Sequence, residues 1–393
     1  MTPTPAAVAL PAVAPTSREH RGSFGVYVHV PFCFARCGYC DFNTYTPAEL
    51  GGANPDAWVA ALARELELAA ARLGGPRADT VFVGGGTPSL LGGARLAQVL
   101  DHVREHFGLA DDAEVSTEAN PESTSPAFFD TIRAAGYTRV SLGMQSVSPR
   151  VLATLDRIHS PGRPVAAARE ARAAGFENLN IDLIYGTPGE TDDDLLRSAE
   201  AAVEAGVDHV SAYGLIVEDG TALARRVRRG ELPAPDNDVL ARRYELVDAT
   251  LRAAGMDWYE VSNWSRPGAA CRHNLGYWDG GRWWGAGPGA HSYDGALRFW
   301  NVKHPNAYAS VLESGSLPVA GFEELSESDR HTEDVMLRLR MRHGLALAAL
   351  DAGERERAAV AVADGLLVTE DERLVLTDHG RLLADAVVRS LLG

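Results

Sequence analysis

Three cysteines lie within one short loop near the start of the chain, and their spacing suggests metal chemistry. Cys33, Cys37 and Cys40 are four and then three residues apart and follow the apolar run 25–30. Three thiols in so short a loop cannot all pair as disulfides, whereas three thiolates can occupy three corners of an iron–sulfur cube and leave one iron open. A zinc site that adds His29 is the alternative. The spacing favours the iron–sulfur cluster, because zinc motifs usually separate two pairs of ligands.

The spacing Cys33-x3-Cys37-x2-Cys40, with the aromatic Tyr39 before the last cysteine, resembles the signature of the radical S-adenosylmethionine (SAM) enzymes. The resemblance implies a [4Fe-4S] cluster whose open iron is chelated by the amino and carboxylate groups of SAM. An electron from the cluster would then break the sulfonium C–S bond and yield a 5′-deoxyadenosyl radical. The cofactor would supply the reactive chemistry, and the protein would orient and shield it.

Other polar or glycine-rich positions follow apolar runs that predict strands. The turn 84–88 contains three glycines, which allow the backbone to approach a ligand closely. Glu118 and Gln145 end two further runs, and Arg157 follows a predicted helix. Asp182 lies inside an apolar run, where a buried carboxylate must be paired or ligated. Each of the others has a plain structural explanation, as a tight turn, a solvated loop, a surface amide or a helix-end cation.

These positions would gather at one mouth if the chain forms a parallel barrel, because the carboxyl ends of its strands meet there. Strand and helix patterns alternate six times, as parallel βαβ units require. The expected helices are 55–73, 91–107, 126–135, 164–174 and 192–205, and the expected strands are 25–30, 80–83, 114–118, 139–145, 178–185 and 209–217. We therefore predict an α/β fold, a partial (β/α)6 barrel over residues 23–255.

The remaining third of the chain predicts two further parts. A helix covers 236–254, and the Trp-, Tyr- and Gly-rich stretch 258–300 shows little periodicity, so residues 256–325 are expected to be irregular structure and a connector over the barrel mouth. Residues 326–393 predict a small winged-helix-like α+β domain, with helices over 326–341 and 378–392 around a hairpin at 366–377. On an acidic chain such a domain is expected to make packing or protein contacts rather than to bind DNA.

Composition and charge exclude several classes of partner. The 393 residues carry a formal net charge of −16, which argues against nucleic acid or an anionic membrane surface. The four cysteines, three of them in one loop, fit a reducing cytoplasm. Residues 1–22 predict a disordered Ala/Pro-rich tail, because no basic residue precedes their apolar part as a signal peptide would require. No apolar run approaches the roughly 18 residues of a transmembrane span.

A closer resemblance, to the oxygen-independent coproporphyrinogen III oxidase family, covers nearly the whole chain after residue 22. It is carried by five motifs: Tyr27-Val-His-Val-Pro-Phe-Cys33, Gly84-Gly-Gly-Thr-Pro88, Glu118-Ala-Asn-Pro-Glu, Leu142-Gly-Met-Gln-Ser and Asn180-Ile-Asp-Leu-Ile-Tyr-Gly186. The resemblance implies that SAM is contacted by Tyr27, Gly85, Gly86, Thr87, Glu118, Gln145, Arg157 and Asp182, with Tyr39 beside the cluster.

Two departures from the true oxidase resemble the branch of the family that acts as haem chaperones. The oxidase has one more cysteine two residues after its last ligand, where this chain has Phe42, and it has a longer N-terminal segment. The resemblance therefore implies a protein that binds haem and delivers it to acceptor haemoproteins, membrane-bound respiratory enzymes among them, without coproporphyrinogen oxidase activity. Radical decarboxylation of coproporphyrinogen III is the alternative, and a radical SAM methyltransferase is a weaker one.

The stretch Cys271–Trp278 resembles the His-Asn-x-x-Tyr-Trp motif of that branch, which implies that His273 is the haem ligand. A neutral imidazole can take an axial position on haem iron, and nearby tyrosines and tryptophans offer a flat apolar surface. A histidine satisfied within an aromatic core is the alternative. His291 is a second candidate ligand, and Cys271 is expected to be a buried structural thiol.

Overall fold

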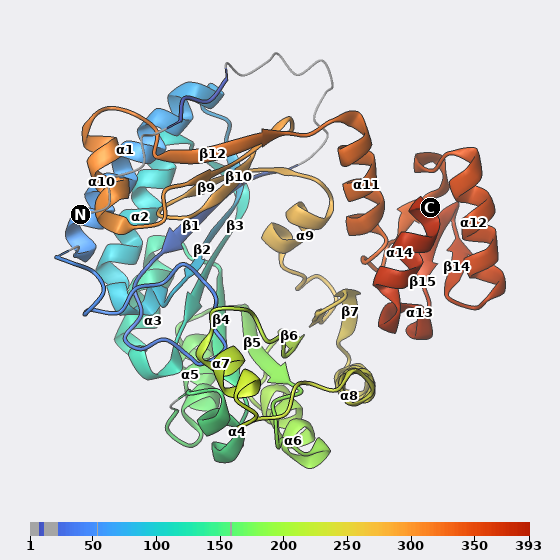
Figure 1. The fold of residues 1–393 in the computed structure, drawn as a ribbon. Coiled ribbons are helices and arrows are strands. Elements are labelled where there is room, and N and C mark those ends of the chain that lie inside the picture. The colour runs from blue at the N-terminus through green and yellow to red at the C-terminus, as the bar shows by residue number, and fades with distance from the viewer. Residues whose placement is uncertain (1–7, 12–22, 53, 158) are drawn as a thin grey trace.

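The computed structural model describes residues 8–11, 23–52, 54–157 and 159–393. Its centre is a set of parallel strands that pair in the order in which they occur in the chain. They are β1 (Phe24–Val30), β2 (Ala78–Gly85), β3 (Leu109–Ala119), β4 (Arg139–Gln145), β5 (Asn178–Tyr185) and β6 (His209–Gly214). The predicted partial (β/α)6 barrel is confirmed, and Figure 1 shows its helices packed along the outside of the strands.

The connecting helices lie close to their predicted positions. They are α1 (Pro55–Leu73), α2 (Gly93–His106), α3 (Pro126–Ala135), α5 (Arg163–Ala173) and α6 (Asp192–Glu204), followed by α8 (Asn237–Ala253). The side chains of Asn54 and Ser125 cap the amino ends of α1 and α3, and Gly74 and Gly136 end these helices in the left-handed conformation. The short helix α4 (Pro149–Thr154) is the helix expected just before Arg157, whereas α7 (Ala222–Arg228) was not predicted.

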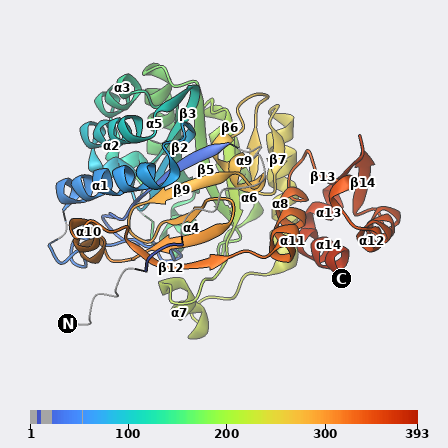
Figure 2. The same ribbon diagram turned by 90° about the horizontal axis from the view of Figure 1, so that it is seen from above.

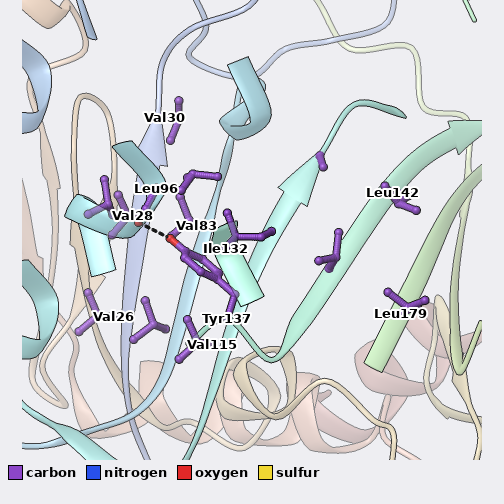
Figure 3. Packing of buried hydrophobic residues seen from close by; sticks show 14 of the residues in the cluster. Val26, Val28, Val30, Val83, Leu96, Val115, Ile132, Tyr137, Leu142 and Leu179 are labelled. Carbon is purple, nitrogen blue, oxygen red and sulfur yellow. Dashed lines mark hydrogen bonds between the residues drawn. The ribbon is translucent and has the colours of Figure 1, made fainter. Parts of the chain in front are cut away.

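The barrel core is built from alternate residues of the parallel strands and the inner faces of the helices. Val26, Val28 and Val30 of β1 are fully buried, and Figure 3 shows them beside Val83, Leu96 and Ile132. The Tyr137 hydroxyl donates to the Leu96 carbonyl at 2.9 Å, so its one polar atom is satisfied within the core. Runs of β-branched residues buried on both sides are typical of such parallel strands.

The prediction of irregular structure for residues 258–300 was wrong. On one side β9 (Arg282–Ala286) pairs in parallel with β1, and β10 (His291–Tyr293), β11 (Leu297–Asn301) and β12 (Val319–Glu324) follow in antiparallel order. On the other side β8 (Asn263–Ser265) pairs with β6, and β7 (Asp257–Glu260) with β8. These strands are short and pair with distant segments, so the local sequence shows no periodicity.

The result is one twelve-stranded sheet with antiparallel strands on both sides of the parallel centre, in the order β12-β11-β10-β9-β1-β2-β3-β4-β5-β6-β8-β7. Helix α1 and a further helix, α10 (Pro305–Glu313), cover one face of β9–β11, where Trp284 and Phe299 are buried. A short helix, α9 (Arg272–Trp278), lies beside β1 and β2. Figure 2 shows the extended sheet from above.

The C-terminal residues form the predicted α+β module. It contains α11 (Glu327–Arg338), β13 (Leu345–Ala346), α12 (Ala352–Ala363), β14 (Leu367–Glu370), β15 (Arg373–Leu376), α13 (Asp378–Leu382) and α14 (Ala384–Leu392). Strand β13 and helix α12 were not predicted. The buried Arg381 joins the module to α8 through Tyr244 and Asp248, both at 2.9 Å. In both views the module lies at the opposite end of the molecule from α1–α3 (Figures 1 and 2).

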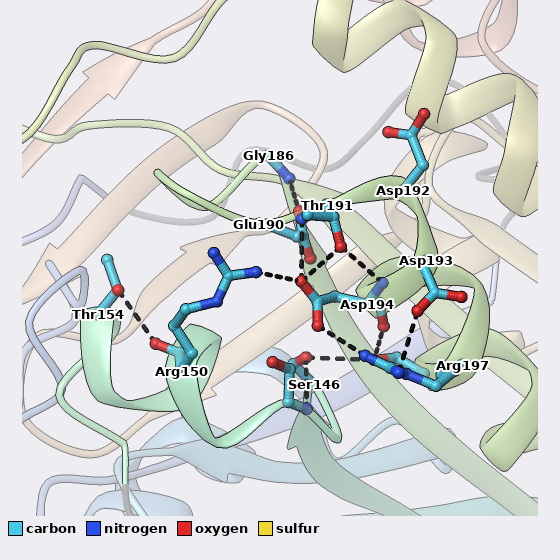
Figure 4. Close-up of polar contacts among 12 residues, drawn as sticks. Ser146, Arg150, Thr154, Gly186, Glu190, Thr191, Asp192, Asp193, Asp194 and Arg197 are labelled. Carbon is cyan, nitrogen blue, oxygen red and sulfur yellow. Dashed lines mark hydrogen bonds and ion pairs between the residues drawn. The ribbon is translucent and has the colours of Figure 1, made fainter.

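Ion pairs fix the helices that follow β4 and β5, as Figure 4 shows. Asp194 and Thr191 form a capping box at the start of α6, and Asp194 also accepts hydrogen bonds from Arg150 of α4 at 2.6 Å and Arg197 at 2.9 Å. Hydrogen bonds from Thr191, Ser148 and Arg150 outweigh burial and hold the pKa of Asp194 well below its usual range. The carboxyl ends of β4 and β5 are thereby held together.

The predicted disordered tail of residues 1–22 lies mostly outside the described residues. The stretch 8–11 is an exception, because the Val8 amide donates to the Val319 carbonyl at 2.9 Å and Arg72 donates to the Pro11 carbonyl at 2.7 Å. No described helix combines the length and the apolar character that crossing a bilayer requires.

Candidate functional site

The cysteine loop leaves β1 and returns along its own start. The Tyr45 amide donates to the Pro31 carbonyl at 2.7 Å and the Cys33 amide to the Tyr45 carbonyl at 3.1 Å, so the loop is closed at its base. Cys33, Cys37 and Cys40 are partly buried and unpaired. Burial raises the pKa of the Cys33 thiol and raises that of Cys40 to about 11.

The spacing of the three sulfurs fits a cluster better than one zinc ion. Ligands 2.3 Å from a tetrahedral zinc would lie about 4 Å from each other. Among the described residues, the sulfur atoms of Cys33, Cys37 and Cys40 do not all lie within 4.8 Å of one another. A larger group such as an iron–sulfur cube accommodates this wider arrangement.

The glycine turn after β2 supports the cysteine loop from below. The Gly86 amide donates to the Val30 carbonyl at 2.7 Å and the Thr87 amide to the Phe32 carbonyl at 2.8 Å. The Thr87 hydroxyl lies 3.6 Å from the Cys33 sulfur. Gly85 has φ +108°, and a Cβ there would lie 2.7 Å from the His29 ring, so only glycine fits this close approach. The turn therefore holds the start of the cysteine loop, with Cys33, in a fixed position relative to β1 and β2.

Arg157 brings a positive charge to the cluster loop. Its guanidinium donates to the Cys37 sulfur at 3.5 Å, to the Gly143 carbonyl at 3.0 Å and to His159 at 3.0 Å. Burial lowers the pKa of Arg157, but the nearby Tyr39 and Cys37 raise it by more. Burial and then Cys37 raise the pKa of Tyr39. A cation in this position favours thiolate over thiol, as a metal-bound cysteine requires.

Two half-buried carboxyl groups lie near the end of β3 and in the middle of β5. Glu118 accepts a hydrogen bond from the Gly85 amide at 3.0 Å, and burial followed by the charge of Asp182 raises its pKa to about 8. Asp182 accepts from Ser141 and Asn180, both at 2.7 Å, and burial raises its pKa in spite of these bonds. Two carboxyl groups held this way are suited to a cationic ligand, whose charge would ionise them.

Gln145 marks the end of β4 with an unusual backbone. Its φ is 67°, in the left-handed region that residues other than glycine rarely adopt. The amide lies beside Gly143, where a Cβ would meet the Gln145 Nε2 at 3.1 Å and Arg157 at 2.8 Å. Strain of this kind is concentrated at functional sites, and here it places the side chain against the Arg157 contact.

A cavity of about 1660 Å³ opens above the cysteine loop. It exceeds the roughly 300–1,000 Å³ of pockets that hold drug-sized ligands. The predicted residues Tyr27, Cys37, Cys40, Gly85 and Glu118 line it, together with aromatic and basic residues of β9–β11 and charged residues of α11. A second cavity of about 150 Å³ lies behind it and is lined by Tyr27, Glu118, Asp182, His273 and Tyr277.

His273 lies on α9 with both ring nitrogens engaged. Nδ1 is 2.8 Å from the Thr80 hydroxyl and Nε2 is 2.8 Å from the Tyr277 hydroxyl. The ring stacks on Phe82 with centroids 5.4 Å apart, and burial lowers the pKa of His273 to about 3. His273 is therefore a neutral, hydrogen-bonded imidazole at the wall of the smaller cavity.

Two residues of the site were missed by sequence analysis. Asn43 joins the cysteine loop to residues before β10 and after β11. Its backbone carbonyl lies 2.9 Å from His29 Nε2, and its amide donates to the carbonyls of Pro288 and Lys303, both at 2.9 Å. Glu65 lies in the buried face of α1 and accepts from Tyr308 at 2.6 Å. Its position in the sequence was a signal, because it shares the helical spacing of Leu62 and Ala69.

Comparison with known proteins gives a consistent family. Residues 27–202 match the model of the radical SAM superfamily, and residues 325–383 match that of the HemN C-terminal domain. The chain is 72% identical over 388 residues to the heme chaperone HemW of Mycobacterium tuberculosis, covering 99% of each chain. It is 33% identical to the heme chaperone HemW of Escherichia coli, with 93% of this chain and 97% of that protein covered.

A solved structure supports the fold independently. The structure described as coproporphyrinogen III oxidase (HemN) from Escherichia coli, a radical SAM enzyme, superposes with a TM-score of 0.82 and 24% identity, and covers 95% of this chain and 91% of that one. At this identity the match concerns the fold alone. The full-length relatives show that the chain belongs to the heme chaperone HemW family, with a radical SAM domain and a HemN C-terminal domain.

Proposed function

We propose that this protein binds haem in the large cavity beside a SAM-ligated [4Fe-4S] cluster and delivers the haem to acceptor haemoproteins. The observation that supports the proposal best is that one cavity is lined both by Cys37 and Cys40 and by aromatic and basic side chains suited to a porphyrin. The similarity to relatives named heme chaperones, which extends over nearly the whole chain, supports the same function.

The residues present fit both cofactors. Cys33, Cys37 and Cys40 would hold the cluster, which with SAM supplies one-electron chemistry when bound. Arg157 would stabilise the thiolate of Cys37, to which it already donates. SAM would be bound by the predicted set: Tyr27, Gly85, Gly86, Thr87, Glu118, Gln145, Arg157 and Asp182, with Tyr39 beside the cluster.

His273 as the haem ligand stays a prediction, and the structure shows what its binding to iron would require. Both of its nitrogens are hydrogen-bonded in this fold, so Tyr277 must release Nε2, or Thr80 must release Nδ1, before the ring can bind iron. Acceptor haemoproteins, including membrane-bound respiratory enzymes, are proposed as recipients, and nucleic acid is not expected as a partner of so acidic a chain.

Haem titration of the anaerobically reconstituted protein tests the proposal. We expect the Soret band to saturate at one haem per chain and the bound haem to transfer to an apo-haemoprotein. Absence of stoichiometric binding would contradict the proposal. The fold of the oxidase favours coproporphyrinogen III decarboxylation as the second candidate, and formation of protoporphyrinogen IX by the same preparation would support that function instead.

A further inference from the structure

We infer that His291 is the axial ligand of haem iron in the large cavity, with the porphyrin lying along the face of β9–β11. The inference rests on the proposed haem binding and assigns the residue and the orientation of that site. Five histidines line the two cavities, namely His29, His209, His273, His291 and His331. Their hydrogen bonds and positions distinguish them.

Three of these rings, those of His29, His209 and His273, have hydrogen-bond partners at both nitrogens. Iron coordination by any of these three requires a contact of the fold to break.

His331 differs from His291 in its position. Its Nε2 lies 2.7 Å from a carboxylate oxygen of Glu354, which leaves Nδ1 available, but the ring lies on α11 and not on the aromatic strands β9–β11.

His291 has the arrangement that a metal-binding histidine requires. Its side chain is exposed and lines the large cavity. The ring is hydrogen-bonded to the backbone of Gly289, and within the described residues no side chain is hydrogen-bonded to the ring. A histidine that donates one N–H to a backbone carbonyl presents the other nitrogen to a metal in a fixed orientation.

The backbone around His291 is held from several sides. The Gly287 amide donates to the buried Glu65 carboxylate at 2.8 Å, and the Gly289 amide donates to the Val302 carbonyl at 3.0 Å. Gly289 has φ +73°, and a Cβ there would lie 2.6 Å from the Asn43 amide that bonds to Pro288. A ligand on such a rigid segment needs little reorganisation to bind iron.

The register of the antiparallel strands places an aromatic surface next to His291. Tyr293 lies opposite Trp283 on β9 and opposite Arg298 on β11, so these side chains share one face, while Ser292 between them is buried. The ring of Trp283 lies 5.5 Å from that of Tyr293 and 4.7 Å from that of Tyr277. A porphyrin plane ligated by His291 would extend over this surface.

Two cations are placed to receive the haem propionates. Lys303 is close enough to His291 to lower its pKa electrostatically, and Arg330 of α11 acts on Tyr293 in the same way. Within the described residues neither takes part in an ion pair, whereas Arg298 and Arg338, which also line the cavity, are paired with carboxylates. Unpaired cations at a cavity wall favour anionic groups of the ligand.

The test compares His291→Ala with His273→Ala and His331→Ala in the full-length, anaerobically reconstituted protein. Ferric haemin is titrated in, and electron paramagnetic resonance and magnetic circular dichroism report the axial nitrogen. We expect His291→Ala to lose the histidine signature and to bind haemin at least about tenfold more weakly, the size of effect seen when a metal site loses support. Added imidazole should restore the signature. His331→Ala is the matched control, because it removes a histidine from the same cavity.

The outcomes separate the ligand from the function. The assignment of His291 would be overturned if His291→Ala kept the histidine signature or if His273→Ala lost it. In either case, haem binding by the parent protein would still support the proposed function. Absence of saturable haemin binding by the parent would overturn both. Circular dichroism and the cluster iron content of each variant identify misfolding, and imidazole rescue of His291→Ala supports the assignment even if its affinity falls for another reason.

Discussion

The two parts of the central sheet build their share of the site in different ways. In the parallel part, β1–β6, the functional side chains lie at the carboxyl ends of consecutive strands, as in other barrels of this class. In the antiparallel part, β9–β12, they lie across one face, where alternate residues such as His291 and Tyr293 point into the cavity. A site at strand ends is compact, whereas a site on a sheet face is broad and flat.

Burial follows the same division. Glu118 and Asp182 of the parallel part are half-buried, and burial raises the pKa of both. His291 in the antiparallel part is exposed to the cavity. Half-buried carboxyl groups suit a small cationic cofactor and an open aromatic surface suits a porphyrin, in keeping with the proposed sites for SAM in one part and haem in the other.

Replacing a cluster ligand is expected to have the largest effect, because it removes the cluster and affects only the site in the parallel part. Cys37→Ala should reduce the iron and sulfide content of the reconstituted protein to background, because the loop then offers too few thiolates. Cys271→Ala is the matched control: burial raises the pKa of this thiol to about 12, so it stays protonated and is not expected to bind iron. Equal iron loss in both variants would contradict the assignment.

Glu65→Leu should have the second largest effect, by destabilising the antiparallel part of the sheet. The carboxylate accepts from Tyr308, Gly287 and Trp284, and an apolar replacement leaves these buried donors without an acceptor. Each costs about 1–3 kcal/mol, so the free energy of unfolding in urea should fall by at least about 3 kcal/mol.

Glu67→Ala is the control for that change, because its exposed side chain on the same helix pairs only with Arg64 among the described residues. Surface substitutions of this kind usually stay within about 0.5 kcal/mol. A Glu65→Leu protein as stable as the control would show that the carboxylate does not hold the two parts together.

The pH dependence of SAM binding sharpens the comparison. Burial and Asp182 raise the pKa of Glu118 from 4.5 to about 8, so the ligand-free fold keeps this proton longer than the unfolded chain does. The resulting stability is fully present below about pH 4.5 and is lost as the pH rises through about 8. A cationic ligand prefers the ionised carboxylate, so SAM affinity should rise by up to about tenfold per pH unit and level off above pH 8.

Calorimetry of SAM binding across this pH range makes the measurement. Glu118→Gln should flatten the profile, whereas Glu122→Gln, a change of an exposed side chain just beyond the strand, should leave it as in the parent. A profile that is flat in the parent protein would remove Glu118 from the SAM site.

The smallest expected effect concerns the haem propionates. Lys303→Met should weaken haemin binding by a few-fold, the scale of about 1 kcal/mol for a partly exposed charge pair. The difference between variant and parent should disappear with haemin dimethyl ester, which carries no propionate charge. Arg77→Met, which removes an exposed cation paired with Asp111 away from the cavity, should change neither affinity. An equal loss with haemin and its ester would contradict the pairing.

Sequence analysis could predict the parallel part because its signals are local. The run 139–145 and the helix 126–135 were predicted with the bounds that the structure has, since each strand is buried on both faces and each helix carries its own cap or terminal glycine. Asp182 was identified because a carboxylate inside an apolar run is conspicuous. The strand ends then followed from topology.

The antiparallel part could not be predicted in this way. Strand β10 has three residues, and its partners β9 and β11 are recognised only by pairing. The contact between Asn43 and Pro288 joins residues 245 positions apart, and no local pattern encodes it. The closed network around His273 was also invisible, because Thr80 and Tyr277 meet the ring from different segments.

The magnetic interaction between cluster and haem tests the central claim, that both occupy one cavity, most directly. Cys37 and His291 line the same space, so the cluster of a fully reduced protein loaded with one haem per chain should relax faster in electron paramagnetic resonance than in the haem-free protein, because ferrous haem with one axial histidine is high-spin and paramagnetic. The enhancement should be weaker in His291→Ala at the same haem concentration, because this variant binds haem less tightly. Haem that binds stoichiometrically and leaves the relaxation of the cluster unchanged would contradict the account.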